Sequence, residues 1–152
     1  MVKKEMAGTK FAEIQFPVER GKIREFANAI RDPNPVYADP EYARRQGFDD
    51  VLMPVTFPGT FTFHLDSENA VMKMIETLGM DAGKSVHGSF EVIYERPVSS
   101  GETLRGEVLI GKISQKEGKR GGRMTFVEME INFYDSKNRL AVVARNEFIE
   151  RG

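Results

Sequence analysis

The sequence contains no cysteine among its 152 residues. Disulfide bonds, thiolate metal ligands and a cysteine nucleophile are therefore excluded together. Histidine is almost as scarce, because His64 and His87 are the only two. Any chemistry must come from oxygen groups and these imidazoles.

A long apolar run is also absent. No window approaches the roughly 20 continuous apolar residues that a membrane-spanning helix needs. The amino-terminal segment holds Lys3 and Lys4 but no apolar stretch after them, so it lacks the pattern of a signal peptide. We therefore expect a cytoplasmic protein with no membrane partner.

The charges nearly cancel, with 22 basic and 23 acidic side chains. This balance gives no general attraction to nucleic acid or to an anionic membrane. The turn at 116–123 is locally basic, but it lacks the interleaved aromatic residues of a nucleic-acid site. A solvated hairpin is the favoured interpretation, and a contact to the phosphates of coenzyme A is the alternative. A composition of 40% apolar and 30% charged residues fits one domain over 1–152.

The first half of the chain has mainly helical periodicity after one short strand. Loose alternation over 11–18 predicts a strand, and apolar residues at helical spacing predict a helix over 20–31. Asp39-Pro40 is typical of a helix start and predicts a short helix over 41–46. An apolar stripe formed by Leu65, Val71, Met74, Ile75 and Leu78 predicts the longest helix, over about 60–78.

The second half alternates with period two. Apolar residues recur at every other position in four stretches that begin near residues 86, 104, 125 and 140. The short links between them favour an antiparallel meander or a close relative of one. We therefore predict an α+β domain in which a curved sheet wraps a long central helix. That arrangement is the hot-dog fold, although other α+β arrangements share the same order of elements.

The most informative stretch is Asp32-Pro33-Asn34-Pro35-Val36-Tyr37, between the first two predicted helices. With its surroundings, it makes the chain resemble the MaoC-like dehydratases, of the N-terminal type. That family includes (R)-specific enoyl-CoA hydratases and hydroxyacyl-carrier-protein dehydratases. The matching stretches span nearly the whole chain. They are Phe26 to Tyr37, Ala43, Gly47, Met53 to Phe57, His87-Gly88 with Phe90 and Tyr94, Arg96-Pro97, Gly101-Glu102, and the closing strand with Glu147 and Arg151-Gly152.

The resemblance implies a hot-dog fold and thioester substrates bound between two such domains. It places the catalytic aspartate on Asp32, the asparagine on Asn34 and the catalytic histidine on Tyr37. It also implies substrate contacts in the following loop, at Pro54, Thr56, Phe57 and Gly59. Neither a metal nor a redox cofactor is implied.

The tyrosine is the departure that matters for function. Hydration of a 2-enoyl thioester needs a base to hold water and donors that polarise the carbonyl. Imidazole titrates near working pH, whereas phenol needs a downward shift of roughly 3 units, or about 4 kcal/mol, to act as a base. We therefore expect Tyr37 to pack or to form hydrogen bonds. Asp32 and Asn34 could equally bond their own backbone in a helix-terminating turn.

Three functions remain open at this point. The favoured one is a MaoC-like subunit that binds a 3-hydroxyacyl or 2-enoyl thioester, carried by coenzyme A or acyl carrier protein. Another hot-dog subunit, in a homo- or hetero-oligomer, would then supply the complete Asp–His pair. The second is a self-sufficient homodimer that hydrates, dehydrates or hydrolyses a thioester, with Asp32 and His64 or ordered water. The third is a non-enzymatic acyl-CoA-binding module.

Overall fold

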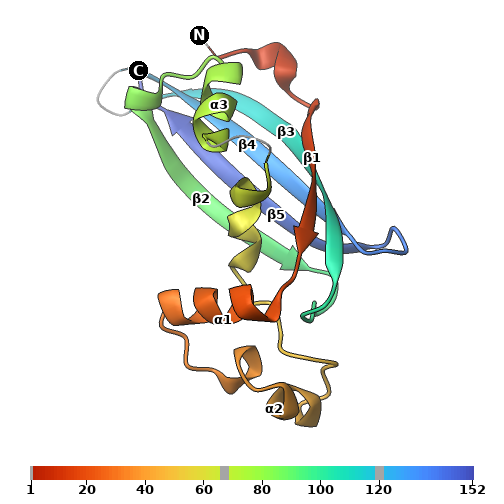
Figure 1. Ribbon diagram of the computed structural model, residues 1–152. Helices are drawn as coiled ribbons and strands as arrows, with labels where there is room; N and C mark the ends of the chain where they lie inside the picture. Colours follow the sequence, from red (N-terminus) through yellow and green to blue (C-terminus); the bar gives the residue numbers. More distant parts are fainter. Residues whose placement is uncertain (1, 66–68, 119–121) are drawn as a thin grey trace.

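The computed structural model describes residues 2–65, 69–118 and 122–152. Five strands form one antiparallel sheet in the order β1-β3-β4-β5-β2, so β1 and β2 lie at opposite edges (Figure 1). The strands are β1 (Lys10–Pro17), β2 (Ser85–Tyr94), β3 (Thr103–Glu117), β4 (Arg123–Tyr134) and β5 (Leu140–Glu150). The predicted strands are confirmed.

The strand neighbours differ partly from a simple meander. β3, β4 and β5 follow one another across the sheet, but β2 pairs with β5 rather than with β3. β1 occupies the free side of β3, where Ile14 pairs with Gly106. A methyl group at Gly106 would come within 2.7 Å of Ile14 Cγ1, so glycine is what allows the two strands to approach.

The alternation along the central strands separates a buried face from a charged one. On the inner face, the side chains of β3 and β4 are almost completely buried. They are Leu104, Val108, Ile110, Val127, Met129, Ile131 and Phe133. On the outer face, Arg145 pairs with Glu130 at 2.9 Å and with Glu91 at 3.2 Å. The single apolar face must therefore be covered by the helical part of the chain.

Helices cover that face and one end of the sheet. They are α1 (Arg20–Ala29), α2 (Pro40–Arg45) and α3 (Ala70–Thr77), with 3₁₀ turns at η1 (Lys4–Met6), η2 (Pro35–Tyr37), η3 (Phe57–His64) and η4 (Ala82–Lys84). Figure 1 shows η3 and α3 in front of the sheet and α1 and α2 beyond its end. The predicted α+β architecture and its first two helices are confirmed.

The prediction of one continuous helix over about 60–78 is wrong. The segment starts as the 3₁₀ helix η3, Leu65 is extended with φ −81° and ψ 139°, and α3 begins only at Ala70. The stretch 66–68 lies outside the described residues. The apolar stripe behind the prediction has no member between Leu65 and Val71. Helical spacing does not bridge such a gap.

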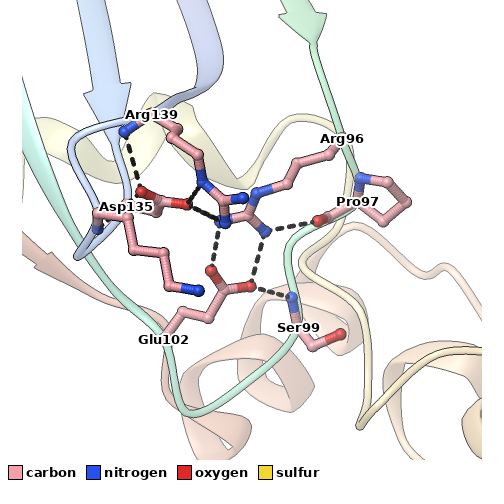
Figure 2. A network of polar contacts seen from close by, with 7 residues as sticks. Arg96, Pro97, Ser99, Glu102, Asp135 and Arg139 are labelled. Atoms are coloured by element: carbon pink, nitrogen blue, oxygen red, sulfur yellow. Dashed lines mark hydrogen bonds and ion pairs between the residues drawn. The ribbon is translucent and has the colours of Figure 1, made fainter.

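A network of charged side chains joins the β2–β3 link to the β4–β5 hairpin (Figure 2). The Arg96 guanidinium donates to Glu102 at 2.6 and 3.1 Å and contacts Asp135 at 3.5 Å. Arg139 in turn pairs with Asp135 at 2.8 Å. The same link accepts a hydrogen bond from Met53 N at Val98 O, at 2.9 Å. The network therefore also holds the loop that precedes η3.

Candidate functional site

The Asp32–Tyr37 stretch is a turn stabilised by its own side chains. Asp32 Oδ1 accepts from the backbone N–H of Asn34 at 3.0 Å. Asn34 Oδ1 accepts from Val36 N–H at 3.1 Å and so caps η2. Each side chain therefore uses one oxygen in the local backbone, as in the turn that was the alternative interpretation. The second Asp32 oxygen has no hydrogen-bond partner among the described residues.

Tyr37 is half-buried and packs against the core. Burial raises its pKa above the ordinary value for tyrosine, and the negative charge of Asp32 raises it further. This shift is opposite to the one that a phenolate base would need. At neutral pH Tyr37 is therefore an uncharged phenol, which can donate or accept a hydrogen bond but cannot take up a proton from water.

Tyr94 is a neighbour of Tyr37 that belongs to the family resemblance but was not predicted as a site residue. It ends β2, and its hydroxyl donates to the carbonyl oxygens of Pro54 at 3.2 Å and Val55 at 3.1 Å. Burial, and then the proximity of Tyr37, raise its pKa. The alternation of β2 placed Tyr94 on the inner face. Only the folded chain brings it together with residues 37, 54 and 55.

Of the predicted substrate-contact residues, Pro54 and Thr56 lie in the loop before η3. Phe57 and Gly59 lie in η3 itself. The carbonyl oxygen of Pro54 accepts from Tyr94, and exposed Thr56 precedes η3. The Phe57 ring is buried, and its centre lies 5.7 Å from the centre of the Phe16 ring. At Gly59 a methyl group would lie 3.3 Å from the Phe90 ring, so η3 rests closely on β2 at this point.

A cavity of about 500 Å³ lies between α1 and η3, at the end of β1. The described residues that line it are Pro17, Glu19, Lys22, Glu25, Phe26, Ala29, Phe57, Thr60, Phe63 and His64. Asp32, Asn34 and Tyr37 are not among them. The structure therefore brings Asp32 and Tyr37 together but places His64 in a separate group.

His64 lies inside the cavity with its ring 4.9 Å from that of Phe16. Burial lowers its pKa below the ordinary value, and the charge of Glu19 partly opposes that shift. His87 lies elsewhere, on β2, where Nε2 is 3.2 Å from Asn146 Oδ1 and the ring is 5.6 Å from Phe148. This contact supports a structural interpretation of His87.

The described residues form neither a metal-binding cluster nor a membrane-spanning helix. Within 2–65, 69–118 and 122–152, no group of three or more histidine, aspartate or glutamate side chains is arranged to hold a metal ion. No helix in the same part of the chain is long and apolar enough to cross a membrane. Of the basic turn at 116–123, residues 119–121 lie outside the described part, and Lys116 Nζ sits 5.0 Å from the centre of the Phe126 ring.

Comparison with known proteins gives relatives along most of the chain. A family model described as FAS1-like, dehydratase domain region, matches residues 5–144. The UPF0336 protein of Streptomyces avermitilis is 41% identical over 105 residues, which are 68% of this chain and 67% of the relative. The UPF0336 protein of Thermobifida fusca is 38% identical over 117 residues, which are 76% and 72% of the two chains.

Solved structures with low sequence identity share the fold. A MaoC-like dehydratase superposes with a TM-score of 0.77 at 20% identity, over 97% of this chain and 42% of its own. The C-terminally truncated HadBC complex of Mycobacterium tuberculosis, a (3R)-hydroxyacyl-ACP dehydratase, superposes with a TM-score of 0.75 at 18% identity. The match covers 97% of this chain and 99% of the other. The ChsH1-ChsH2 complex of the same organism superposes with a TM-score of 0.73 at 20% identity, over 93% of this chain and 83% of the other. The predicted hot-dog fold and MaoC-like resemblance are confirmed.

Proposed function

This chain belongs to the family of FAS1-like dehydratase domain regions, and we propose on that basis that it is the non-catalytic subunit of a hydratase/dehydratase assembly in the cytoplasm. It would bind a (R)-3-hydroxyacyl or 2-enoyl thioester of coenzyme A or acyl carrier protein. A second hot-dog subunit would supply the complete Asp–His pair. The chain would contribute binding surface and hydrogen bonds rather than the base.

The protonation of Tyr37 carries this proposal. The family pattern has a histidine at this position, and the reaction needs a group that exchanges a proton near neutral pH. Here burial and Asp32 both hold the phenol in its neutral form. The neighbouring phenol of Tyr94 is held neutral as well, because it is more deeply buried. Two adjacent phenols can orient a substrate or a water, but they do not replace an imidazole base.

The need for a partner is supported by the similar complexes. Both HadBC and ChsH1-ChsH2 are described as complexes of two differently named components, and HadBC is described as a (3R)-hydroxyacyl-ACP dehydratase. An incomplete subunit beside a complete one would explain how Tyr37 is tolerated. A homodimer of this chain would hold two copies of the same incomplete turn.

Turnover by the purified chain tests the proposal directly. With short and medium 2-enoyl-CoA substrates, we expect binding without hydration, measured by loss of the enoyl-thioester absorbance. Hydration or thioester hydrolysis that Asp32→Ala abolishes would instead support the self-sufficient enzyme. Failure to bind any acyl thioester would contradict all three of the functions considered.

Restoring the imidazole is the complementary experiment. We expect Tyr37→His to produce hydration, or to raise it by about tenfold or more, since a positioned general base contributes about 10²–10⁴-fold. Tyr37→Phe is the matched control, because it keeps the ring and adds no base. A folded, ligand-binding Tyr37→His variant with the same activity as Tyr37→Phe would show that residue 37 is not the position of the catalytic base.

A further inference from the structure

The α1–η3 cavity is separate from the Tyr37 group. Its β1 side is formed by Pro17, and His64 packs on Phe16 of the same strand. Tyr37 instead neighbours Tyr94, the last residue of β2. The cavity therefore adjoins β1 and the turn adjoins β2, the strands at the two edges of the sheet.

The walls of the cavity suit an apolar body. Phe26 and Ala29 come from one face of α1, and Phe57 and Phe63 come from η3. Phe63 is 85% exposed, which is unusual for a phenylalanine unless a ligand or partner covers it. A volume of about 500 Å³ is in the range of small-molecule sites, which are mainly apolar with a few polar groups.

His64 is an uncharged polar group in this cavity with free hydrogen-bonding capacity. The Thr60 hydroxyl already donates to the carbonyl oxygen of Phe57 at 2.8 Å. Neither ring nitrogen of His64 is hydrogen-bonded to another described residue, while Phe16 fixes the ring plane. A neutral imidazole offers one donor and one acceptor. That pair matches a hydroxyl group, which also donates once and accepts.

The charges at the rim select against an anion. Lys22 Nζ and Glu25 Oε2 lie 3.0 Å apart and neutralise each other. Glu19 forms no ion pair with a residue in the described part of the chain, and its side chain does not cap α1. The rim therefore carries one uncompensated negative charge, which would repel a carboxylate or phosphate.

We infer that the α1–η3 cavity is a second binding site, which takes an uncharged molecule with an aliphatic body and a single hydroxyl group. The body lies between Phe26, Phe57 and Phe63. The hydroxyl group bonds to the imidazole of His64. This site is distinct from the Asp32–Tyr37 turn, which contributes no lining side chain to it, and of the predicted thioester contacts it shares only Phe57.

The protein has two histidines, and each gives one Hε1 resonance in a proton NMR spectrum, so the two rings can be followed separately. We expect 1-octanol to shift the His64 resonance to a saturating limit and to leave that of His87 in place. Octanoate, which has a carboxylate instead of the hydroxyl, should bind at least about tenfold more weakly than 1-octanol. No saturable shift up to the solubility limit of 1-octanol, equal shifts at both histidines, or equal binding of octanoate would each overturn the inference.

Variants on the wall give the second readout. Phe63→Ala should weaken 1-octanol binding by about tenfold, since a substantial apolar contact is lost. The side chain is on the surface, so the variant is expected to fold. Met72→Ala is the matched control, because Met72 is 43% exposed on α3 and does not line the cavity. Equal binding by Phe63→Ala and wild type would place the ligand elsewhere.

Discussion

At the residue scale, the surroundings of Tyr37 keep its phenol protonated at neutral pH. The tyrosine stands where the family pattern has histidine, and the reference pKa of tyrosine already argues against a base. Only the structure gives the direction of the shift, because that depends on burial and on Asp32. The proximity of Tyr94 could not be predicted either, since the two tyrosines are 57 positions apart in the sequence and only the fold brings them near each other.

The charge of Asp32 acts on Tyr37, and this can be measured. We expect Asp32→Asn to lower the pKa of Tyr37 toward its ordinary value of about 10, because a nearby negative charge disfavours phenolate. Ultraviolet absorbance during an alkaline titration follows phenolate formation. Tyr37→Phe identifies the contribution of residue 37 among the four tyrosines. An unchanged midpoint would mean that the two side chains do not interact.

At the element scale, the strands were predictable and the helical segment over the sheet was not. Strict alternation marks β3 and β4 because one face of each is buried and the other is charged. The apolar residues on either side of the gap between Leu65 and Val71 suggested one helix, but they do not reveal that the first part is a 3₁₀ helix that ends in an extended residue at Leu65. Strand order was also beyond the sequence. It depends on which edge of β3 is filled by β1.

The pairing of β1 with β3 depends on Gly106. We expect Gly106→Ala to destabilise the protein by about 1–3 kcal/mol, because the added methyl group would meet Ile14 and Phe133 in a close-packed core. Denaturant unfolding gives the change in the free energy of unfolding. Gly21→Ala is the matched control. No heavy atom lies within 4 Å of its new methyl group, and alanine in α1 should stabilise by about 0.5–1 kcal/mol.

Destabilisation by Gly21→Ala as large as that by Gly106→Ala would point to a general intolerance of added methyl groups. If only Gly106→Ala lowers the free energy of unfolding, the close approach of β1 to β3 at this position contributes to the stability of the sheet.

At the scale of the whole molecule, the network around Asp135 joins three parts of the chain that are distant in sequence. Asp135 Oδ1 accepts from the backbone N–H groups of Lys137 and Arg139, both at 2.9 Å. The pKa of Asp135 is lowered to about 2, first by the backbone hydrogen bond from Arg139 and then by its side chain. The sequence predicted a short link between the last two strands, but not its connection to Arg96 and Glu102.

This low pKa predicts an acid-dependent contribution to stability. Because the folded pKa lies below the unfolded value of about 3.9, the unfolded state binds the proton first as pH falls. The contribution is therefore fully present above about pH 4 and is lost as pH falls toward 2. We expect Asp135→Asn to lower stability at neutral pH and to flatten its dependence on pH between these limits, as measured by denaturant unfolding across pH.

Glu91→Gln serves as the control, because the Glu91 side chain is 62% exposed and pairs only with Arg145 among the described residues. Exposed pairs of this kind contribute little. If both variants had the same pH profile as the wild type, the Asp135 network would not contribute to acid stability.

The position of β1 and β2 at the two margins of one sheet has a consequence for how the protein can change. Substitutions at well-separated places combine almost additively. A substitution in the Asp32–Tyr37 turn, next to β2, can therefore change activity and leave binding in the α1–η3 cavity, next to β1, unaltered. Double variants that join Tyr37→His with Phe63→Ala should show this separability as the plain sum of the two single effects.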